Sequence, residues 1–398
     1  MSSLTLVRPR PVHRAADLLA AYLPGSFYFS SARGVLLADG VHSAVPASGH
    51  GDRTRAVAGA LDAAALAGVE HPVAVGAIGF RPDAESSLVV PAVVRRAEAP
   101  RPGGTPAPLA ASFDVRPHPE PAHYVDAVRR ALELIDAGRI DKVVLARALD
   151  LRADTAVPVP ALLSRLVHAD PAAHAFAVDV SAPGDPAPRT LVGASPELLV
   201  SRRGDRVVSN PLAGSLPRVA DEEENRRRVA ALLASAKDRA EHAHVADQVA
   251  EVLGRFCVDL DVPAEPTVIG TPTMWHLSTR ISGRLADPAD PASSALALAE
   301  ALHPTPAVCG VPVGAARDAI ADLEPFDRGY YAGLVGWTDH AGDGEWAVTI
   351  RTAEVSDATV RLFAGAGIVA GSDPDAEVAE TAAKLHTMLR ALGLESGR

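Results

Sequence analysis

The chain has 398 residues, of which 48% are hydrophobic and 22% are charged, and this composition is ordinary for a protein with a large globular core. Its formal net charge of −11 argues against a broad nucleic-acid or anionic-membrane surface, so an anionic substrate would need locally placed cations. The two cysteines exclude a disulfide framework, and the lack of a signal-peptide stretch or a membrane-length apolar run leads us to expect a cytoplasmic protein.

The N-terminal part of the chain mixes short strands with one helix. Strand candidates lie at residues 26–29 and 87–90, and an alanine-rich run predicts a helix near residues 54–67. Residues 97–121 are rich in Pro, Gly and Ala, so they predict a long surface connection.

The middle of the chain consists of runs of strands interrupted by long helices. A helix is predicted over residues 122–137, because its apolar positions share one face. One long helix is predicted over residues 221–256, and the strands are predicted at 142–151, 175–180, 190–200 and 206–209. This order favours an α+β fold over alternating βαβ units.

The strand at residues 141–147 carries a candidate base. On a strand, Lys142, Val144 and Ala146 point to one face, so the neighbours of the lysine on that face would be small and apolar. Loss of solvent lowers a lysine pKa, and a drop of about 3 pH units, costing about 4 kcal/mol, would give a usable base near neutral pH. The alternative is a lysine at the strand end that reaches solvent.

The strand predicted at residues 190–200 carries a candidate acid. Glu197 is the only charged residue in its apolar stretch, and burial raises a carboxyl pKa, which suits a general acid. The alternative is an ordinary exposed strand residue.

Two helices carry clustered charges. One face of the long helix carries Lys237, Asp238, Glu241 and His244, which could belong to a functional site. The alternative is that these side chains only form ion pairs with one another on the protein surface. A zinc site at His242 and His244 is disfavoured, since side chains two apart on a helix diverge. Near the C-terminus, Pro374 suits the first turn of a helix that places Glu377, Glu380 and Lys384 on one face. A solvated surface face is the alternative there.

The segment before the last helix suits a bound carboxylate and a metal ion. A strand is predicted at residues 348–355, from which Arg351 could offer a carboxylate a bidentate fork. Gly365 and Gly367 predict a turn that lets a ligand approach the main chain. Carboxylates are suitable oxygen ligands for Mg²⁺. A dinucleotide fingerprint is disfavoured, because no βαβ unit can follow. The small loops at residues 211–215 and 303–310 either line a pocket or are simple turns.

Taken together, these segments closely resemble the chorismate-utilising enzymes, and within them the isochorismate synthase branch. The resemblance covers residues 115–392 in order, through the segments KVVLAR, GASPELLV, PLAGS, AKDRAEH, HLSTRISG, HPTPAVCG, EPFDRGYYAGLVGW, IRTAEV, AGAGIV and the final ExxETxxK. The N-terminal segments FYFSS and GVLLA resemble the siderophore-pathway members of that branch.

The resemblance implies a role for each candidate. Lys142 would activate water for attack at C2 of chorismate, and Glu197 would protonate the departing C4 hydroxyl while the double bonds shift. Mg²⁺ would be held by Glu241 and Glu380, with Glu377 and Asp238 nearby. The carboxylates of the substrate would be gripped by Arg351, Tyr331, Gly365 and Lys384, in a pocket shaped by Gly214, Ser215 and His276.

Two positions distinguish the members of the family. Aminating relatives usually carry glutamine where Lys142 stands, and no glutaminase partner is expected here. Salicylate synthases, which go on to eliminate pyruvate, typically carry threonine where Ala307 stands. The sequence therefore predicts an isochorismate synthase, an isomerase that feeds catechol siderophore (2,3-dihydroxybenzoate) synthesis, with menaquinone and salicylate as other possible pathways. The alternatives are a salicylate synthase and a non-catalytic chorismate-binding relative.

The resemblance also implies a fold. We expect one α+β domain over residues 1–398, with two large, mostly antiparallel sheets packed face to face and helices outside. Residues 1–114 would complete the chorismate-binding core at residues 115–392. A monomer is the expected state, with chorismate as its small-molecule partner.

Overall fold

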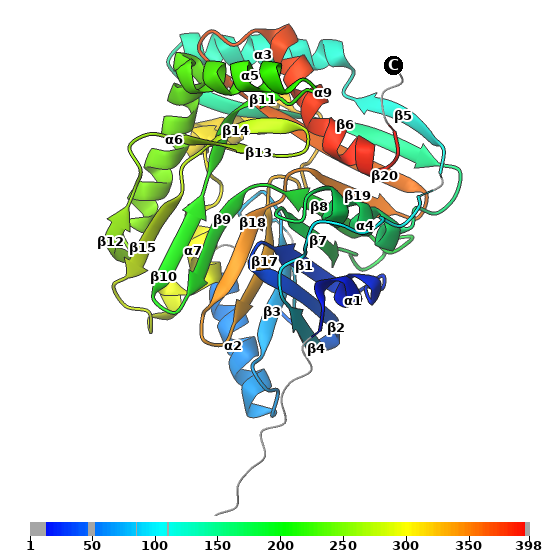
Figure 1. Cartoon of the computed structure of the whole chain (residues 1–398). Helices are drawn as coiled ribbons and strands as arrows, with labels where there is room; N and C mark the ends of the chain where they lie inside the picture. The colour runs from blue at the N-terminus through cyan, green and yellow to red at the C-terminus, as the bar shows by residue number, and fades with distance from the viewer. Residues whose placement is uncertain (1–12, 47–51, 85, 110, 395–398) are drawn as a thin grey trace, which may run out of the picture.

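The computed structural model describes residues 13–46, 52–84, 86–109 and 111–394 of the chain, and its fold is α+β (Figure 1). All pairings between the named strands are antiparallel. Continuous hydrogen bonding joins 17 strands, and three more form a small separate sheet. The predicted α+β class with antiparallel sheets is therefore confirmed.

Fourteen of the 17 strands form two arms that are joined at one edge. The first arm pairs, in order, β12 (Cys257–Asp261), β15 (Ile281–Leu285), β10 (Arg206–Asn210), β9 (Leu198–Arg203), β18 (Gly344–Val348), β17 (Leu334–Asp339) and β3 (Val73–Ile78). The second arm pairs β1 (Phe27–Ser31), β7 (His174–Asp179), β8 (Thr190–Ser195), β19 (Thr352–Ser356), β20 (Thr359–Val369), β6 (Lys142–Ala153) and β5 (Phe113–His118).

The remaining strands join the arms or form the small sheet. The pair β4 (Ser86–Ala97) and β2 (Gly34–Ala44) links β3 of the first arm to β1 of the second. The short β16 (Gly310–Val311) pairs with the start of β6. The small sheet consists of β11 (Leu212–Pro217), β14 (Met274–Ser278) and β13 (Thr267–Gly270).

A buried cluster lies between the two arms and holds them face to face. It takes Phe27 and Phe29 from β1 and Phe176 from β7, and these meet Val75 of β3 and Val335 of β17. Alternate residues of β1 and β2, such as Tyr28 and Leu37, belong instead to the cluster on the opposite face. Because both faces are covered, residues 27–29 of β1 and 35–38 of β2 form continuous apolar runs.

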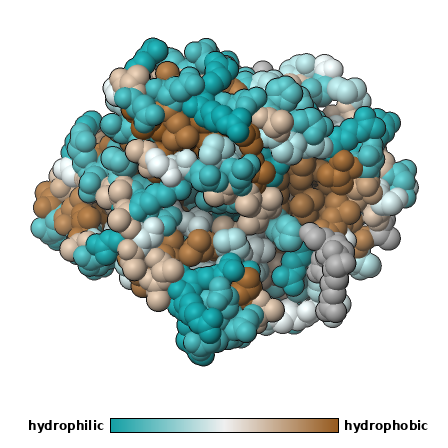
Figure 2. Space-filling view, turned by 90° about the horizontal axis from the view of Figure 1, so that it is seen from above, coloured by the Kyte–Doolittle hydropathy of each residue, from teal (hydrophilic) through white to brown (hydrophobic). Residues whose placement is uncertain are grey.

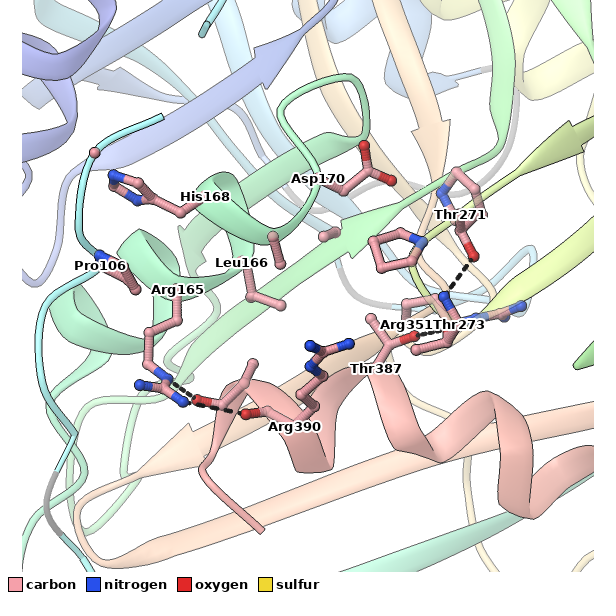
Figure 3. A pocket seen from close by; sticks show the side chains of 16 residues that line it. Pro106, Arg165, Leu166, His168, Asp170, Thr271, Thr273, Arg351, Thr387 and Arg390 are labelled. Carbon is pink, nitrogen blue, oxygen red and sulfur yellow. Dashed lines mark hydrogen bonds between the residues drawn. The ribbon is translucent and has the colours of Figure 1, made fainter. Parts of the chain in front are cut away.

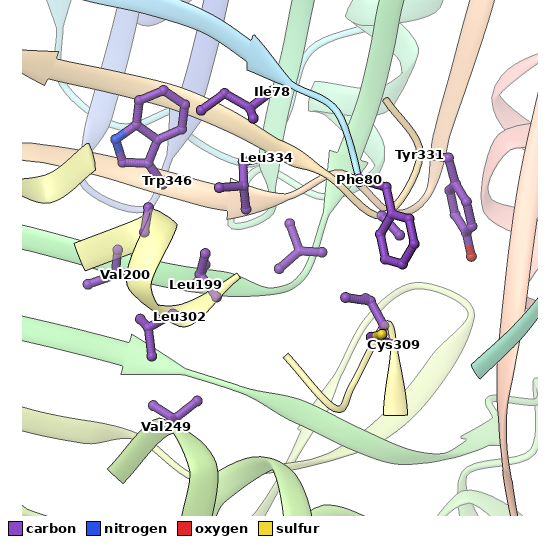
Figure 4. Close-up of a cluster of buried hydrophobic side chains, with 14 of the residues drawn as sticks. Ile78, Phe80, Leu199, Val200, Val249, Leu302, Cys309, Tyr331, Leu334 and Trp346 are labelled. Atoms are coloured by element: carbon purple, nitrogen blue, oxygen red, sulfur yellow. The ribbon is translucent and has the colours of Figure 1, made fainter. Parts of the chain in front are cut away.

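Helices cover the outer faces of the arms. The second arm is covered by α1 (Ala15–Ala20), α4 (Val159–Ala169) and α9 (Pro374–Ala391). The largest cluster, part of which is drawn in Figure 4, receives side chains from α2 (Asp52–Leu66), α3 (Pro121–Asp136), α6 (Ala236–Leu253), α7 (Ala295–Leu302) and α8 (Val313–Leu323). The remaining helices are α5 (Glu222–Ala234) and a short 3-10 turn, Pro291–Ser293.

The distribution of hydrophilic and hydrophobic residues on the surface is consistent with a core buried between sheets and helices. Hydrophilic residues cover much of the face seen from above, and hydrophobic residues show in smaller patches between them (Figure 2). Among the described residues, no helix combines the length and apolar character that crossing a bilayer requires.

Several predicted elements have different boundaries in the structure. The helix predicted over 221–256 is two helices, because Ser235 ends α5 and its hydroxyl caps α6 by accepting from the Asp238 N–H at 3.2 Å. The predicted surface connection at 97–121 contains β5. The strand predicted over 190–200 is interrupted at Pro196 and Glu197, where a proline lacks the N–H that a ladder needs.

Two predictions in the C-terminal segment are wrong. The predicted turn around Gly365 and Gly367 is instead the middle of β20, whose register with β6 runs from Thr359 to Val369. Arg351 does not lie within a strand but in the gap between β18 and β19, in the left-handed backbone region with φ of 54°. In both places contacts with distant strands decide the local structure.

Candidate active site

Lys142 begins β6 and is completely buried. Its Nζ forms an ion pair with Oε1 of Glu241 on α6, at a distance of 2.9 Å. The angle between the two groups is unsuitable for a hydrogen bond. The alternative of a lysine that reaches solvent is therefore wrong. The expectation of purely apolar company is also wrong, because a carboxylate from a distant helix meets the amine.

The surroundings of Glu241 favour its ionised form. Burial would raise its pKa, but the positive charges of Lys142, Lys384 and Lys237 outweigh burial and bring the pKa below its usual value. Gly367 of β20 packs against this pair, since a Cβ placed there would overlap Oε1 of Glu241 and lie 2.9 Å from Cε of Lys142. The glycine therefore leaves the space in which the pair forms.

Replacing Gly367 with alanine should displace Lys142 and Glu241. Because the overlapping atoms end flexible side chains, we expect stability to fall by only about 1 kcal/mol. A misplacement of this kind can lower turnover about 10²-fold. Steady-state kinetics and thermal denaturation check this. Gly59→Ala on α2 is the matched control, since its Cβ would meet no atom within 4 Å and turnover should stay unchanged.

Glu197 lies on the link between β8 and β9 and is 2% exposed. Its main chain is fixed, because its N–H donates to Oγ of Ser195 at 3.2 Å and its carbonyl accepts from the Val348 N–H at 3.2 Å. Among the described residues, none is a hydrogen-bond partner of the carboxyl Oε1. Burial raises the pKa of Glu197 to about 7, against the lowering effects of the Leu212 N–H and of Arg351. The alternative of an exposed strand residue is wrong.

Arg351 is buried and held by the small sheet. Its Nη2 lies 3.4 Å from Nε2 of His276, whose Nδ1 lies 2.9 Å from Oγ of Ser215. Ser215 and His276 are direct partners in the β11–β14 register. Burial, followed by the charges of Arg351 and Lys384, holds the pKa of His276 well below its usual value. A neutral imidazole therefore faces the guanidinium.

Tyr331, Gly365 and Lys384 meet at β20. Tyr331 stacks on Phe363 with 5.0 Å between the ring centres, and a Cβ on Gly365 would lie 2.9 Å from its hydroxyl. Nζ of Lys384 donates to the Gly365 carbonyl at 2.9 Å and lies 2.7 Å from Oε1 of Glu380. Two positive charges, Lys384 of α9 and Arg351 in the link between β18 and β19, thus lie near Glu197, since both interact electrostatically with its carboxyl.

The predicted metal carboxylates face one another across α6 and α9. Burial raises the pKa of Asp238, and the charges of Glu241 and Glu380 raise it further. The pKa of Glu377 is likewise raised, first by burial and then by Glu380. Glu377 is paired with Lys237 at 3.0 Å, yet no residue that the structure describes forms a hydrogen bond with its buried Oε2. Within the described part of the chain, no three acidic, His or Cys groups adopt a metal-holding arrangement.

Of the two predicted pocket loops, the first is wrong, because residues 212–215 belong to β11, but both segments contact these elements. Gly214 has φ of 75°, and a Cβ there would lie 3.0 Å from Cβ of Asp238, so β11 packs closely on α6. Ala307 is partly buried in the loop that leads to β16. In that loop the carbonyl of Cys309 accepts from the Val144 N–H at 2.7 Å, which ties it to the strand of Lys142.

A cavity of about 260 Å³ adjoins this group of residues at Arg351 (Figure 3). Arg165 of α4 and Arg390 of α9 add cations to its lining, and Thr387 donates to or accepts from Thr273 across it at 2.9 Å. Sequence reasoning missed these lining residues, because a surface arginine on a helix carries no signal of its own.

The fold and the site together define a class of protein: a two-armed antiparallel α+β enzyme with a buried lysine and glutamate beside cations suited to an anionic substrate. The sequence model of the family described as chorismate binding enzyme matches residues 95–393. The chain belongs to this chorismate-binding enzyme family.

Individual relatives cover nearly the whole chain. Isochorismate synthase DhbC of Bacillus subtilis is 47% identical over 96% of this chain and 97% of its own. A crystal structure from Bacillus anthracis, provisionally described as a 2,3-dihydroxybenzoate-specific isochorismate synthase, DhbC, has a TM-score of 0.91 and 43% identity, covering 96% of this chain and 99% of its own. The structure of MenF, the menaquinone-specific isochorismate synthase of Escherichia coli, has a TM-score of 0.78 and 25% identity. The match covers 97% of this chain and 92% of the MenF chain.

Proposed function

We propose that this protein is an isochorismate synthase, an isomerase that converts chorismate to isochorismate. One observation carries the proposal most directly: a buried carboxyl with a pKa near 7, Glu197, shares a site with a buried lysine, Lys142. This pair suits an acid and a base that act on one substrate. The similarity to isochorismate synthases over nearly the full chain supports the same assignment.

In the proposed mechanism, Lys142 takes a proton from a water molecule as its oxygen bonds to C2 of chorismate. The ring double bonds shift, and the C4–O bond breaks. Glu197 gives its proton to the departing hydroxyl, which leaves as water. One water is therefore consumed and one released, and the reaction is an isomerisation. Arg351, Tyr331 and Lys384 would bind the substrate carboxylates, with the Gly365 main chain, Gly214, Ser215 and His276 shaping the pocket.

The acidic residues fit a magnesium ion. The charges of Glu241 and Glu380 add to burial in raising the pKa of Asp238, and the charge of Glu380 does the same for Glu377. Among the described residues the buried Oε2 of Glu377 has no hydrogen-bond partner, and a hard cation that takes oxygen ligands would satisfy it. Glu241 and Glu380 would hold Mg²⁺ directly, with Glu377 and Asp238 nearby. When bound, the ion neutralises negative charge on the dianionic substrate. Because Glu241 is the present partner of Lys142, its use as a ligand would separate these two charges.

Removing the metal should therefore abolish turnover. We expect EDTA to lower the rate to background and added Mg²⁺ to restore it. Mg²⁺ should also raise the thermal midpoint of the wild-type protein, and this rise should be absent in Glu380→Gln. Full activity in a metal-free protein would contradict the metal proposal.

The products test the proposed reaction. Incubation with chorismate and Mg²⁺ near neutral pH should yield isochorismate without a matching amount of pyruvate. Ala307, rather than threonine, supports this stopping point. Stoichiometric pyruvate and salicylate would instead establish a salicylate synthase, and no turnover at all would favour a non-catalytic chorismate-binding protein.

The similarity to DhbC of Bacillus subtilis, at 47% identity over 96% of this chain, supports the siderophore branch, and a relative provisionally described as MenF of Mycobacterium tuberculosis follows at 45% identity over 93%. We therefore propose that the product feeds catechol siderophore synthesis. We also propose a cytoplasmic monomer of one domain that acts without a glutaminase subunit.

A further inference from the structure

Arg328 and Glu324 form a buried ion pair that the mechanism does not use. Glu324 follows the last residue of α8, and Arg328 lies in the link to β17. Nε of Arg328 donates to Oε2 of Glu324 at 2.8 Å, and Nη2 lies 2.5 Å from Oε1. The two side chains are 2% and 3% exposed. This is a bidentate fork held inside the protein.

The pair fills a gap in the pairing of β6. One edge of β6 pairs with β20 along its length, whereas the other edge meets β16 at residues 142–143 and β5 at residues 148–153. Between these segments, Oε1 of Glu324 accepts from the Ala146 N–H at 2.7 Å, and Nη2 of Arg328 donates to the Val144 carbonyl at 2.7 Å. Side chains therefore supply hydrogen bonds where no described strand does, two and four residues after Lys142.

The same guanidinium holds the loop that carries Ala307. Nη1 of Arg328 donates to the Val308 carbonyl at 2.8 Å. The Arg328 carbonyl accepts from the Tyr331 N–H at 2.8 Å, and its guanidinium lies 4.5 Å above the Phe80 ring. Phe80, Tyr331 and Cys309 are drawn together at one side of the large cluster (Figure 4). One buried residue thus contacts the strand of the proposed base, the loop of Ala307 and the turn of Tyr331.

We propose that Arg328 and Glu324 are positioning residues for the reaction, which fix Lys142 relative to the substrate and to the Ala307 loop. The inference rests on the proposed function. A buried ion pair often contributes little net stability compared with well-packed apolar residues, so stability alone is a weak reason for this one. Geometry is a stronger reason, because an error of about 1 Å at a reacting group can lower turnover about 10²-fold.

The chain offers a matched control. Arg53 and Glu300 form a second buried pair, 2.6 Å apart and 2% and 5% exposed, which joins α2 to α7. The test compares Glu324→Gln and Arg328→Met with Glu300→Gln and Arg53→Met, in kcat, KM and thermal midpoint. We expect all four to lower the midpoint. Only the first two should lower kcat, by about 10- to 100-fold, with KM within about threefold of wild type.

The conservative variant separates positioning from folding. Arg328→Lys keeps the charge but not the fork, so its kcat should lie between those of wild type and Arg328→Met. If Arg328→Met does not fold, Glu324→Gln and Arg328→Lys decide the question. The proposal is overturned if the folded variants of the Arg328 pair keep kcat within twofold while their midpoints fall like those of the control pair. Wild-type turnover, measured first, tests the proposed function separately.

Discussion

Replacing Lys142 with methionine should lower kcat by about 10²- to 10⁴-fold, the range attributed to a positioned general base. Methionine fills similar space but cannot accept a proton. Substrate binding should change less, because the groups proposed to hold the carboxylates, Arg351 and Lys384, remain in place. Steady-state kinetics with chorismate, together with the thermal midpoint, would measure both effects.

A second variant separates catalysis from folding. In Lys142→Met the partly buried Glu241 loses its ion-pair partner, which itself costs stability. The double variant Lys142→Met/Glu241→Gln removes both charges, so it should recover most of the lost thermal midpoint and still be inactive. If the double variant regained turnover, or if Lys142→Met kept normal kcat, Lys142 would not be the base.

The sequence predicted the class of fold and the residue types of the site because both depend on local patterns. Runs of β-branched and apolar residues marked the strands, and Lys142 and Glu197 were recognisable as charges within or beside such runs. The structure confirms the burial that this pattern indicated for both residues. Family resemblance then joined segments that no local pattern could connect.

The remaining features depend on contacts between distant segments. Sequence spacing could not show that Glu241 faces Lys142, because 98 residues separate them and the contact depends on how α6 packs against β6. It placed Gly365 and Gly367 in a turn, whereas pairing with β6 holds them in a strand. Arg328 and Glu324 were missed, although two opposite charges among aromatic residues in EPFDRGYY were an available signal.

Replacing Glu197 with glutamine should lower kcat by about 10²- to 10⁴-fold, because the amide cannot protonate the departing hydroxyl. The pH dependence gives a sharper test. A general acid must carry its proton, and Glu197 holds it up to a pKa of about 7. We therefore expect the wild-type kcat to fall as pH rises through 7, and the residual rate of Glu197→Gln to lack that fall. A wild-type rate independent of pH between 6 and 8.5 would contradict this role.

The same carboxyl should leave a signature in stability that is independent of activity. In the unfolded chain Glu197 loses its proton near the ordinary value of 4.5, whereas in the folded protein it keeps the proton to about pH 7. The folded state therefore binds more protons between these values, and the free energy of unfolding falls as pH rises through this window, by roughly 3 kcal/mol. Glutamine has no proton to lose, so denaturant titrations of Glu197→Gln should show less of this fall. The difference between the two proteins isolates the one carboxyl from all other titrating groups. If both lost stability equally between pH 4.5 and pH 8, Glu197 would be ionised throughout that range and could not be the acid.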